Sequence, residues 1–168
     1  MSSCQRGTKE IAIVMGSSSD LSVMQEAIDC LSEFNIGPYV EILSAHRTPE
    51  RMFDFAKTAK DSGLKIIIAA AGGAAHLPGM IAAATTLPVI GVPIKSKHSL
   101  GGFDSLLSIL QMPSGVPVAT MAVDGAKNAA LFALQILALG DADLSQKIID
   151  YKFGLKQKVH EMNQNLLK

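Results

Sequence analysis

The sequence is poor in cysteine and aromatic residues and has no excess of charge of either sign. Its two cysteines, Cys4 and Cys30, are too few for a disulfide framework or a four-ligand metal site. Lys and Arg number 15, as do Asp and Glu, so the strong basic field of a non-specific nucleic-acid or acidic-lipid binder is missing. We therefore expect no nucleic-acid or membrane partner, no bound metal, and a reducing, cytoplasmic location.

Apolar residues, in contrast, are abundant. Hydrophobic residues make up 48% of the chain, and residues 66–94 contain no Asp, Glu, Lys or Arg, a length that would suffice for a membrane span. Glycines and prolines interrupt this stretch and favour two short strands and a helix instead. Residues 11–15 are too short for the apolar region of a signal peptide. We interpret the surplus of apolar residues as surface buried between subunits of a homo-oligomer.

Strand and helix patterns alternate along the chain. Short apolar runs predict strands over residues 11–15, 39–43, 64–71, 88–94 and 117–123. Helical spacing or helix-start residues predict helices from residue 21 and residue 49, and over residues 78–84, 104–110 and 126–139. In the first helix, the predicted buried positions are Leu21, Met24, Ile28 and Leu31. This alternation predicts an α/β fold with a five-stranded parallel sheet between two helical layers.

The two ends of the chain differ from this pattern. Residues 1–10 form a polar leader, and residues 11–140 are expected to form the α/β domain. Residues 141–168 carry apolar side chains at spacings of three and four, as in an amphipathic helix; these are Leu144, Ile148, Tyr151, Leu155, Val159, Met162 and Leu166. This helix can pack on its own domain or lie across a neighbouring subunit.

The polar groups that can do chemistry follow the first two predicted strands. The carboxyl ends of parallel strands form the usual ligand edge of such a sheet. Ser17, Ser18 and Ser19 can simply cap the first helix, or can cradle a phosphate at its positive end. Asp20 can be a first-turn acid or can accept hydrogen bonds from a ribose diol.

A second loop, residues 44–49, contains an imidazole and a guanidinium. Arg47 is either an exposed charge or a bidentate phosphate ligand, since it lies two residues before the helix-opening Pro49. His46 follows Ser44 by two residues, and its imidazole can give and take a proton near neutral pH. We favour a catalytic role for His46.

The loop after the third predicted strand is built of Gly and Ala around His76. Paired glycines allow a close approach of backbone and ligand, and His76 can contact a ligand or fasten the loop to a carbonyl. The motifs HExxH, CxxC and GxxxxGK[ST] are absent, so the sequence supports neither metal chemistry nor ATP hydrolysis.

Several of these motifs, in this order, resemble one enzyme family. They are Gly16-Ser-Ser-Ser-Asp20, Ser44-Ala-His-Arg-Thr-Pro49, Ala71-Gly-Gly-Ala-Ala-His-Leu-Pro-Gly79, Leu87-Pro-Val-Ile-Gly-Val-Pro93 and Asp104-Ser-Leu-Leu-Ser-Ile-Leu-Gln-Met-Pro113. The chain is similar here to the N5-carboxyaminoimidazole ribonucleotide mutases of de novo purine biosynthesis. The resemblance implies a flavodoxin-like octamer with sites between subunits. It also implies an isomerase without cofactor or metal that moves a carboxyl group from an exocyclic nitrogen to ring carbon C4.

The resemblance also implies roles for individual residues. Ser17, Ser19 and Arg47 would hold the 5′-phosphate, Asp20 the ribose, and His46 would transfer protons. The base and the migrating carboxyl would be surrounded by Ser44 and by the loop residues Ala71, Gly72, Gly73, His76 and Leu77.

The chain departs from the family pattern at two places. Ala70 replaces a glycine, which would add a methyl group beside the expected pocket, and the segment 122–128 is two residues shorter than is usual.

Two other functions have to be weighed. A direct carboxylase would use CO2 and the uncarboxylated ribonucleotide, but the stretch 104–113 is typical of the mutase class. A flavodoxin-like binding module is the second alternative. It is disfavoured because the site loops contain no aromatic residue to flank a flavin, and because Ala71 and Gly72 stand where a phospho-acceptor needs an acid.

Overall fold

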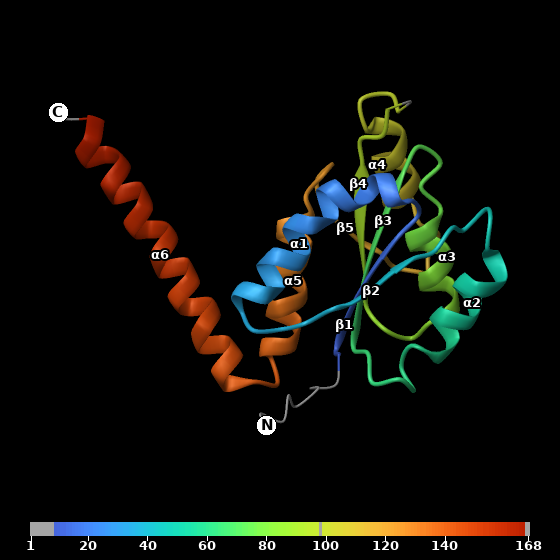
Figure 1. Ribbon diagram of the computed structural model, residues 1–168, viewed down its shortest axis with the longest axis horizontal. Coiled ribbons are helices and arrows are strands. Elements are labelled where there is room, and N and C mark those ends of the chain that lie inside the picture. Colours follow the sequence, from blue (N-terminus) through green and yellow to red (C-terminus); the bar gives the residue numbers. More distant parts are fainter. Residues whose placement is uncertain (1–8, 98, 167–168) are drawn as a thin grey trace, which may run out of the picture. The chain divides into compact units, whose positions relative to one another are not determined.

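The fold is built around one parallel sheet. The computed structural model describes residues 9–97 and 99–166, so most of the expected leader lies outside the described residues. The five strands are β1 (Ile11–Met15), β2 (Tyr39–Ile42), β3 (Ile66–Gly72), β4 (Val89–Ile94) and β5 (Ala119–Thr120). They pair in parallel in the order β2-β1-β3-β4-β5, the order of a flavodoxin-like sheet (Figure 1). The predicted fold class is confirmed.

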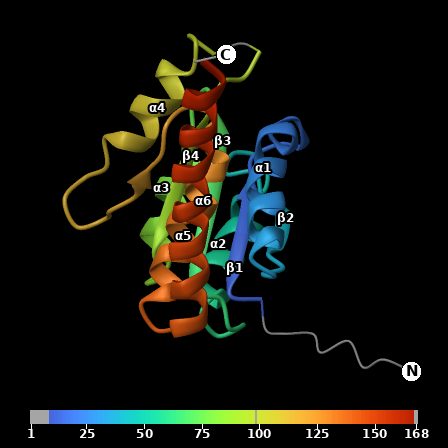
Figure 2. The same cartoon turned by 90° about the vertical axis from the view of Figure 1, so that its left-hand side faces the viewer.

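Helices cover both faces of this sheet. They are η1 (Ser18–Asp20), α1 (Leu21–Glu33), α2 (Pro49–Thr58), α3 (Leu77–Ala84), α4 (Phe103–Leu110) and α5 (Ala126–Ala138). On one face, Ala12 and Val14 of β1 and Ile67 of β3 belong to a buried cluster with residues of α2, α3 and α4. Helix α1 and residues 126–133 of α5 cover the other face (Figures 1 and 2). Because strand side chains alternate between faces, nearly every residue of the central strands is apolar and buried.

The fifth strand is much shorter than the predicted 117–123. Beyond Thr120 the chain still bonds to β4, since the Met121 N–H donates to the Gly91 carbonyl at 2.9 Å and the Asp124 N–H donates to the Pro93 carbonyl at 2.8 Å. In a regular parallel ladder, both strands advance by two residues between such bonds. Here β4 advances by two residues while the segment after β5 advances by three, as in a bulge. The extra residue ends the regular strand.

The buried face of α1 also differs from the prediction. Met24 and Leu31 are buried, but Leu21 is 41% exposed and Ile28 is only partly buried. Ala27 and Cys30 take the buried positions instead. Their small side chains let the helix approach the sheet, and a pattern of large apolar residues does not reveal this.

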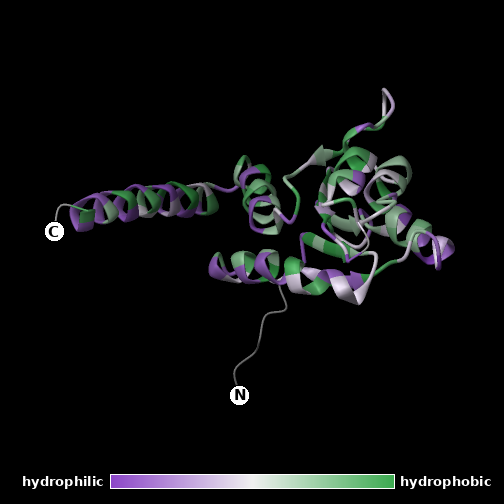
Figure 3. Ribbon diagram, turned by 90° about the horizontal axis from the view of Figure 1, so that it is seen from above, coloured by the Kyte–Doolittle hydropathy of each residue, from purple (hydrophilic) through white to green (hydrophobic). Residues whose placement is uncertain are grey.

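The structure divides into two compact units, the first ending at Ala133 and the second beginning at Leu134. The second unit contains α6 (Ala142–Leu166), which begins where the Asp141 carboxylate accepts the Leu144 N–H at 3.0 Å. Hydrophilic and hydrophobic residues alternate along α6 (Figure 3). Leu144 is buried, whereas Leu155, Val159 and Met162 are exposed. Among the described residues, no helix is both long enough and apolar enough to cross a membrane.

Candidate active site

A cavity of about 400 Å³ opens at the carboxyl ends of β1, β2, β3 and β4. This edge includes the point between β1 and β3 where the strand order reverses, which is the usual ligand site of such sheets. The cavity brings together all but one of the residues predicted from the sequence. Those present are Ser17, Ser19, Asp20, Ser44, His46, Arg47, Ala71, Gly72, His76 and Leu77.

Gly73 does not line the cavity, although it was predicted to do so. Its φ of +63° lets the chain turn between β3 and α3, so its contribution is to the path of the loop. Ala70 is also not at the cavity. Its side chain is fully buried within β3, so the methyl group that departs from the family pattern packs in the core.

Four lining residues were not among the predicted site residues, namely Gly16, Ala45, Ala74 and Ser96. The first three belong to loops that the sequence motifs had already singled out. Ser96 follows β4, and its hydroxyl belongs to no motif with a recognisable chemistry. Its place beyond the carboxyl end of a strand is the one signal that could have found it.

The serine loop after β1 is organised by Asp20. The Asp20 carboxylate accepts the Ser17 N–H and the Ser19 hydroxyl, both at 3.2 Å, and the Ser17 oxygen accepts the Ser19 N–H at 3.3 Å. This is a capping box, but Ser17 caps the short turn η1 that precedes α1, whose own N-cap position is taken by Asp20 without a side-chain bond. Burial raises the pKa of Asp20, and hydrogen bonds from Ser19, Ser17 and Gly16 lower it in part.

Arg47 joins the first two loops. Its Nη2 donates to the Gly16 carbonyl at 3.1 Å, and its Nε donates to the Ser44 hydroxyl, also at 3.1 Å. The Ser44 oxygen additionally accepts the Arg47 N–H at 3.2 Å. Thr48 closes the turn, because its hydroxyl donates to the Ser44 carbonyl and accepts the Ser44 N–H. Ser44 therefore orients the guanidinium toward the serine loop.

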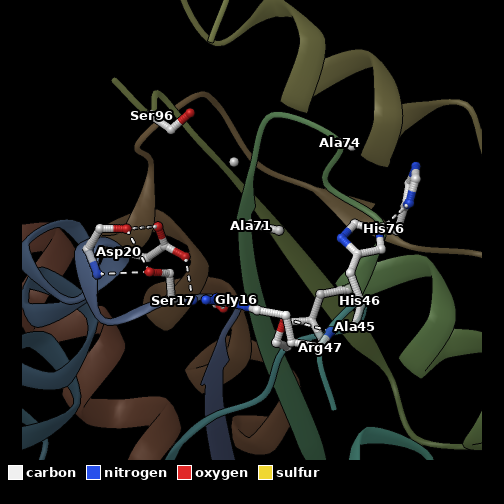
Figure 4. A pocket seen from close by; sticks show the side chains of 14 residues that line it. Gly16, Ser17, Asp20, Ala45, His46, Arg47, Ala71, Ala74, His76 and Ser96 are labelled. Carbon is white, nitrogen blue, oxygen red and sulfur yellow. Dashed lines mark hydrogen bonds between the residues drawn. The ribbon is translucent and has the colours of Figure 1, made fainter. Parts of the chain in front are cut away.

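The two histidines of the cavity contact each other. Nε2 of His46 lies 2.8 Å from Nδ1 of His76, and the ring planes meet at 82° (Figure 4). His46 comes from the loop after β2, and His76 immediately precedes α3. Both side chains are exposed to the cavity and the solvent. The sequence allows His76 either to contact a ligand or to fasten the loop to a carbonyl, and in this structure the partner of its ring is a second imidazole.

The remaining wall is made of small apolar groups and Ser96. Ala45, Ala71 and Leu77 are buried residues that border the cavity. A side chain at Gly72 would be crowded, because a Cβ on it would lie 3.0 Å from the Ser96 Cβ and 3.1 Å from the Ile94 carbonyl oxygen. Across the described part of the chain, no three His, Cys, Asp or Glu side chains gather in a way that could hold a metal ion.

The cavity thus brings groups that can bind an anion and groups that can transfer a proton to one edge of the sheet. The anion site combines the Arg47 guanidinium with serine groups at the positive end of the η1–α1 segment. Beside it lies the pair of imidazoles, groups that can transfer protons near neutral pH, bordered by an alanine-rich wall. Such an arrangement suits acid–base chemistry on a small phosphorylated molecule.

The model of the family described as AIR carboxylase matches residues 10–158, a range that includes every residue of the cavity. The chain belongs to this family. A protein from Pyrococcus horikoshii named N5-carboxyaminoimidazole ribonucleotide mutase is 57% identical over 156 residues, covering 93% of this chain and 88% of that protein. The protein of the same name from Bacillus subtilis is 54% identical over 159 residues, covering 94% and 98%.

A solved structure gives the same result for the fold. PurE from Treponema denticola superposes with a TM-score of 0.84 at 31% identity, and the alignment covers 94% of this chain and 98% of that one. The resemblance found in the sequence is therefore confirmed at the level of the AIR carboxylase family and its fold.

Proposed function

We propose that the chain is an isomerase of de novo purine biosynthesis. It converts N5-carboxyaminoimidazole ribonucleotide into 4-carboxy-5-aminoimidazole ribonucleotide by moving the carboxyl group from the exocyclic nitrogen to ring C4. The observation that carries this proposal is a proton-transfer group, His46, beside an anion site, in a chain 57% identical to a protein named for that reaction.

The substrate is held mainly through its ribose phosphate. Arg47 and the hydroxyls of Ser17 and Ser19 bind the 5′-phosphate, and Asp20 accepts hydrogen bonds from the ribose hydroxyls. This assignment is supported by the contacts of Arg47 with Gly16 and Ser44, which fix its guanidinium beside the serine loop before any ligand arrives. Fixing a donor in advance reduces the entropy that binding must overcome.

His46 then moves one proton in each half of the reaction. It protonates the carbamate nitrogen, the N–C bond breaks, and its electron pair stays on nitrogen, which leaves CO2 and an electron-rich amino-imidazole. C4 of that ring attacks the CO2 carbon and forms the new C–C bond. His46 removes the proton from C4, so the imidazole ends as it began and neither oxidant nor cofactor is consumed.

The apolar wall keeps the released CO2 near C4. Ala45, Ala71, Ala74 and Leu77 provide no strong hydrogen-bonding side chain near the histidines. An apolar wall holds no ordered water that would hydrate CO2, and close confinement favours its recapture over escape. The base and the carboxyl group would lie between this wall and Ser44.

We extend the proposal to assembly and location. The expected homo-octamer is supported by exposed apolar side chains on and before α4, where Leu100 is 79% exposed and Phe103 is 67% exposed. A mutase domain of residues 11–140 and a separate C-terminal helix of residues 141–168 remain part of this proposal, as does a cytoplasmic location. Light scattering of the purified protein measures the oligomeric state, and cell fractionation tests the location.

A turnover assay tests the function itself. Freshly prepared N5-carboxyaminoimidazole ribonucleotide is mixed with the protein, and the absorbance of the carbon-carboxylated product is followed. Formation of that product without added bicarbonate supports the mutase. Product formed only from the uncarboxylated ribonucleotide plus bicarbonate would identify a direct carboxylase instead. A yellow, flavin-containing preparation without turnover would favour the binding module.

A further inference from the structure

Asp124 lies in the short segment that follows β5 and departs from the family pattern. Its φ is +57°, a left-handed conformation that glycine, asparagine and aspartate adopt more readily than other residues. Its N–H donates to the Pro93 carbonyl at 2.8 Å, and its carboxylate accepts the Lys95 N–H at 2.9 Å. One residue thus bonds to the backbone on both sides of Ile94, the last residue of β4.

These two bonds reproduce the pairing of a regular parallel strand. A strand residue opposite Ile94 would donate its N–H to residue 93 and accept the N–H of residue 95 with its own carbonyl. Asp124 makes the first bond with its backbone and the second with its side chain. Its own carbonyl is then free to accept the Ala126 N–H at 2.9 Å, where α5 begins. The carboxylate therefore extends the β4 ladder while the main chain turns into the helix.

The backbone that these two bonds fix, at the end of β4, leads directly into one wall of the cavity. Ser96 follows Lys95 directly and lines the cavity, with its side chain against the α-carbon of Gly72. Two further contacts hold the same loop from the other side. The buried Ser105 hydroxyl donates to the Ile94 carbonyl at 2.9 Å, and Val123 fills the space where a side chain on Gly102 would lie.

We propose that Asp124 is a positioning residue for the substrate site, acting through Lys95 on Ser96. It holds the chain beyond the end of β4 at the distance from Gly72 that the bound ribonucleotide requires, and it acts as a hydrogen-bond acceptor in place of a backbone carbonyl. The kinetic part of this inference rests on the proposed function. Asp124 touches no reacting atom, so its loss should weaken binding and leave the chemical step nearly intact.

Two substitutions separate the side-chain bond from the backbone conformation. Asp124→Gly accepts the positive φ without strain but has no acceptor for the Lys95 N–H. Asp124→Asn tolerates the same φ and keeps an oxygen at the acceptor position. Asn35→Gly is the matched control, because Asn35 also has a positive φ, of 63°, but lies outside the cavity at the end of α1.

Hydrogen exchange followed by mass spectrometry measures how strongly the Asp124–Lys95 bond protects nearby backbone amides, independently of catalytic activity. In Asp124→Gly, we expect amides 94–97 to exchange about fivefold faster and KM to rise about fivefold, with kcat changed less than about twofold. Asp124→Asn and Asn35→Gly should match the unsubstituted protein in exchange and in both kinetic constants.

Each other outcome counts against the proposal. Faster exchange with an unchanged KM would mean that the bond has only a structural role. An Asn variant that behaves like the Gly variant would show that the hydrogen-bond acceptor at position 124 does not determine exchange or KM. If the unsubstituted protein fails to convert the ribonucleotide, the proposed function fails. Asp124 is then judged by exchange of amides 94–97 and by calorimetric affinity for ribose 5-phosphate, where equal values in the Gly variant would overturn its role.

Discussion

Nε2 of His46 and Nδ1 of His76 lie 2.8 Å apart, although 30 residues separate them in the chain. At this distance a single hydrogen lies between the two nitrogens, so one ring donates and the other accepts. The contact ties the His46 ring to a residue on another loop and so restricts its orientation. It occupies one nitrogen of each ring, and in the proposed reaction His46 is the residue that transfers the protons.

His46→Asn should abolish conversion and leave ribonucleotide binding intact. The amide of Asn cannot take up and return a proton at neutral pH, so we expect kcat to fall by about 10²–10⁴-fold. Absorbance assays measure the rate, and calorimetry with the product measures the affinity. His160→Asn, an exposed histidine on α6, serves as the control. Near-normal turnover in His46→Asn would refute its catalytic role.

His76→Asn should have a much smaller effect. Asn can still bond to the His46 ring, and the change removes only part of the contact that orients it. We expect kcat to fall about fivefold, the usual effect of one weakened hydrogen bond. A loss as large as that in His46→Asn would mean instead that His76 handles a proton itself.

The histidine pair also shows which part of the site can be predicted from the sequence and which part cannot. Because both residues follow parallel strands, the pattern places them on the same edge of the sheet. Their contact reaches across β1, which lies between β2 and β3 in the sheet, and apolar runs do not encode that lateral order. Sequence patterns fail to identify Ser96 as a site residue for a different reason. A serine in a polar loop has no distinguishing pattern until the fold places it against Gly72.

Arg47→Lys should chiefly weaken binding. A lysine ammonium cannot reproduce the fixed fork that now contacts both Ser44 and Gly16, so it would meet the phosphate as a mobile point charge. We expect KM to rise roughly tenfold with little change in kcat, measured from full saturation curves. Arg51→Lys is the control, since Arg51 pairs with Glu41 outside the cavity. An unchanged KM in Arg47→Lys would exclude Arg47 as the phosphate ligand.

Gly72→Ala should perturb both stability and binding. The added methyl group would meet the Ile94 carbonyl oxygen and Ser96, and backbone atoms cannot move aside as a flexible side chain can. We expect the free energy of unfolding to fall by about 1–3 kcal/mol, with a raised KM. Chemical denaturation and kinetics measure the two effects. Gly37→Ala, where a Cβ meets nothing within 4 Å, should leave both unchanged. Wild-type behaviour of Gly72→Ala would show that Ser96 and the Ile94 carbonyl both shift without cost, and would contradict this prediction.

The end of β5 and the position of Ala70 show a second limit of sequence patterns. Residues 117–123 have the composition of a strand, but the hydrogen bonds of Met121 and Asp124 reveal one extra residue that ends it. Alternation within a strand buried on both faces gives no hint of orientation, because both faces are apolar. For this reason the methyl group of Ala70 could be predicted beside the pocket although it lies in the core.

Asp20→Asn should stabilise the free protein at neutral pH and impair its function. Burial raises the pKa of Asp20 above its usual 3.8, so the folded protein binds this proton more tightly than the unfolded chain does. Stability from this group is then complete below pH 3.8 and is lost as the pH rises through the folded-state pKa. Asn does not titrate and keeps an oxygen for the Ser17 N–H, while the Ser19 hydroxyl can accept from its amide.

The Tm of Asp20→Asn, relative to the unsubstituted protein, should therefore be highest near about pH 7 and should decline as the pH is lowered toward about pH 4. The same substitution should raise KM, since a carboxylate is the stronger acceptor for a ribose diol. Calorimetric scans across this range, with kinetics near neutral pH, measure both effects. A Tm that is lowered equally at all pH values would contradict this account. It would mean that the capping hydrogen bonds of Asp20 outweigh the cost of burying its charge.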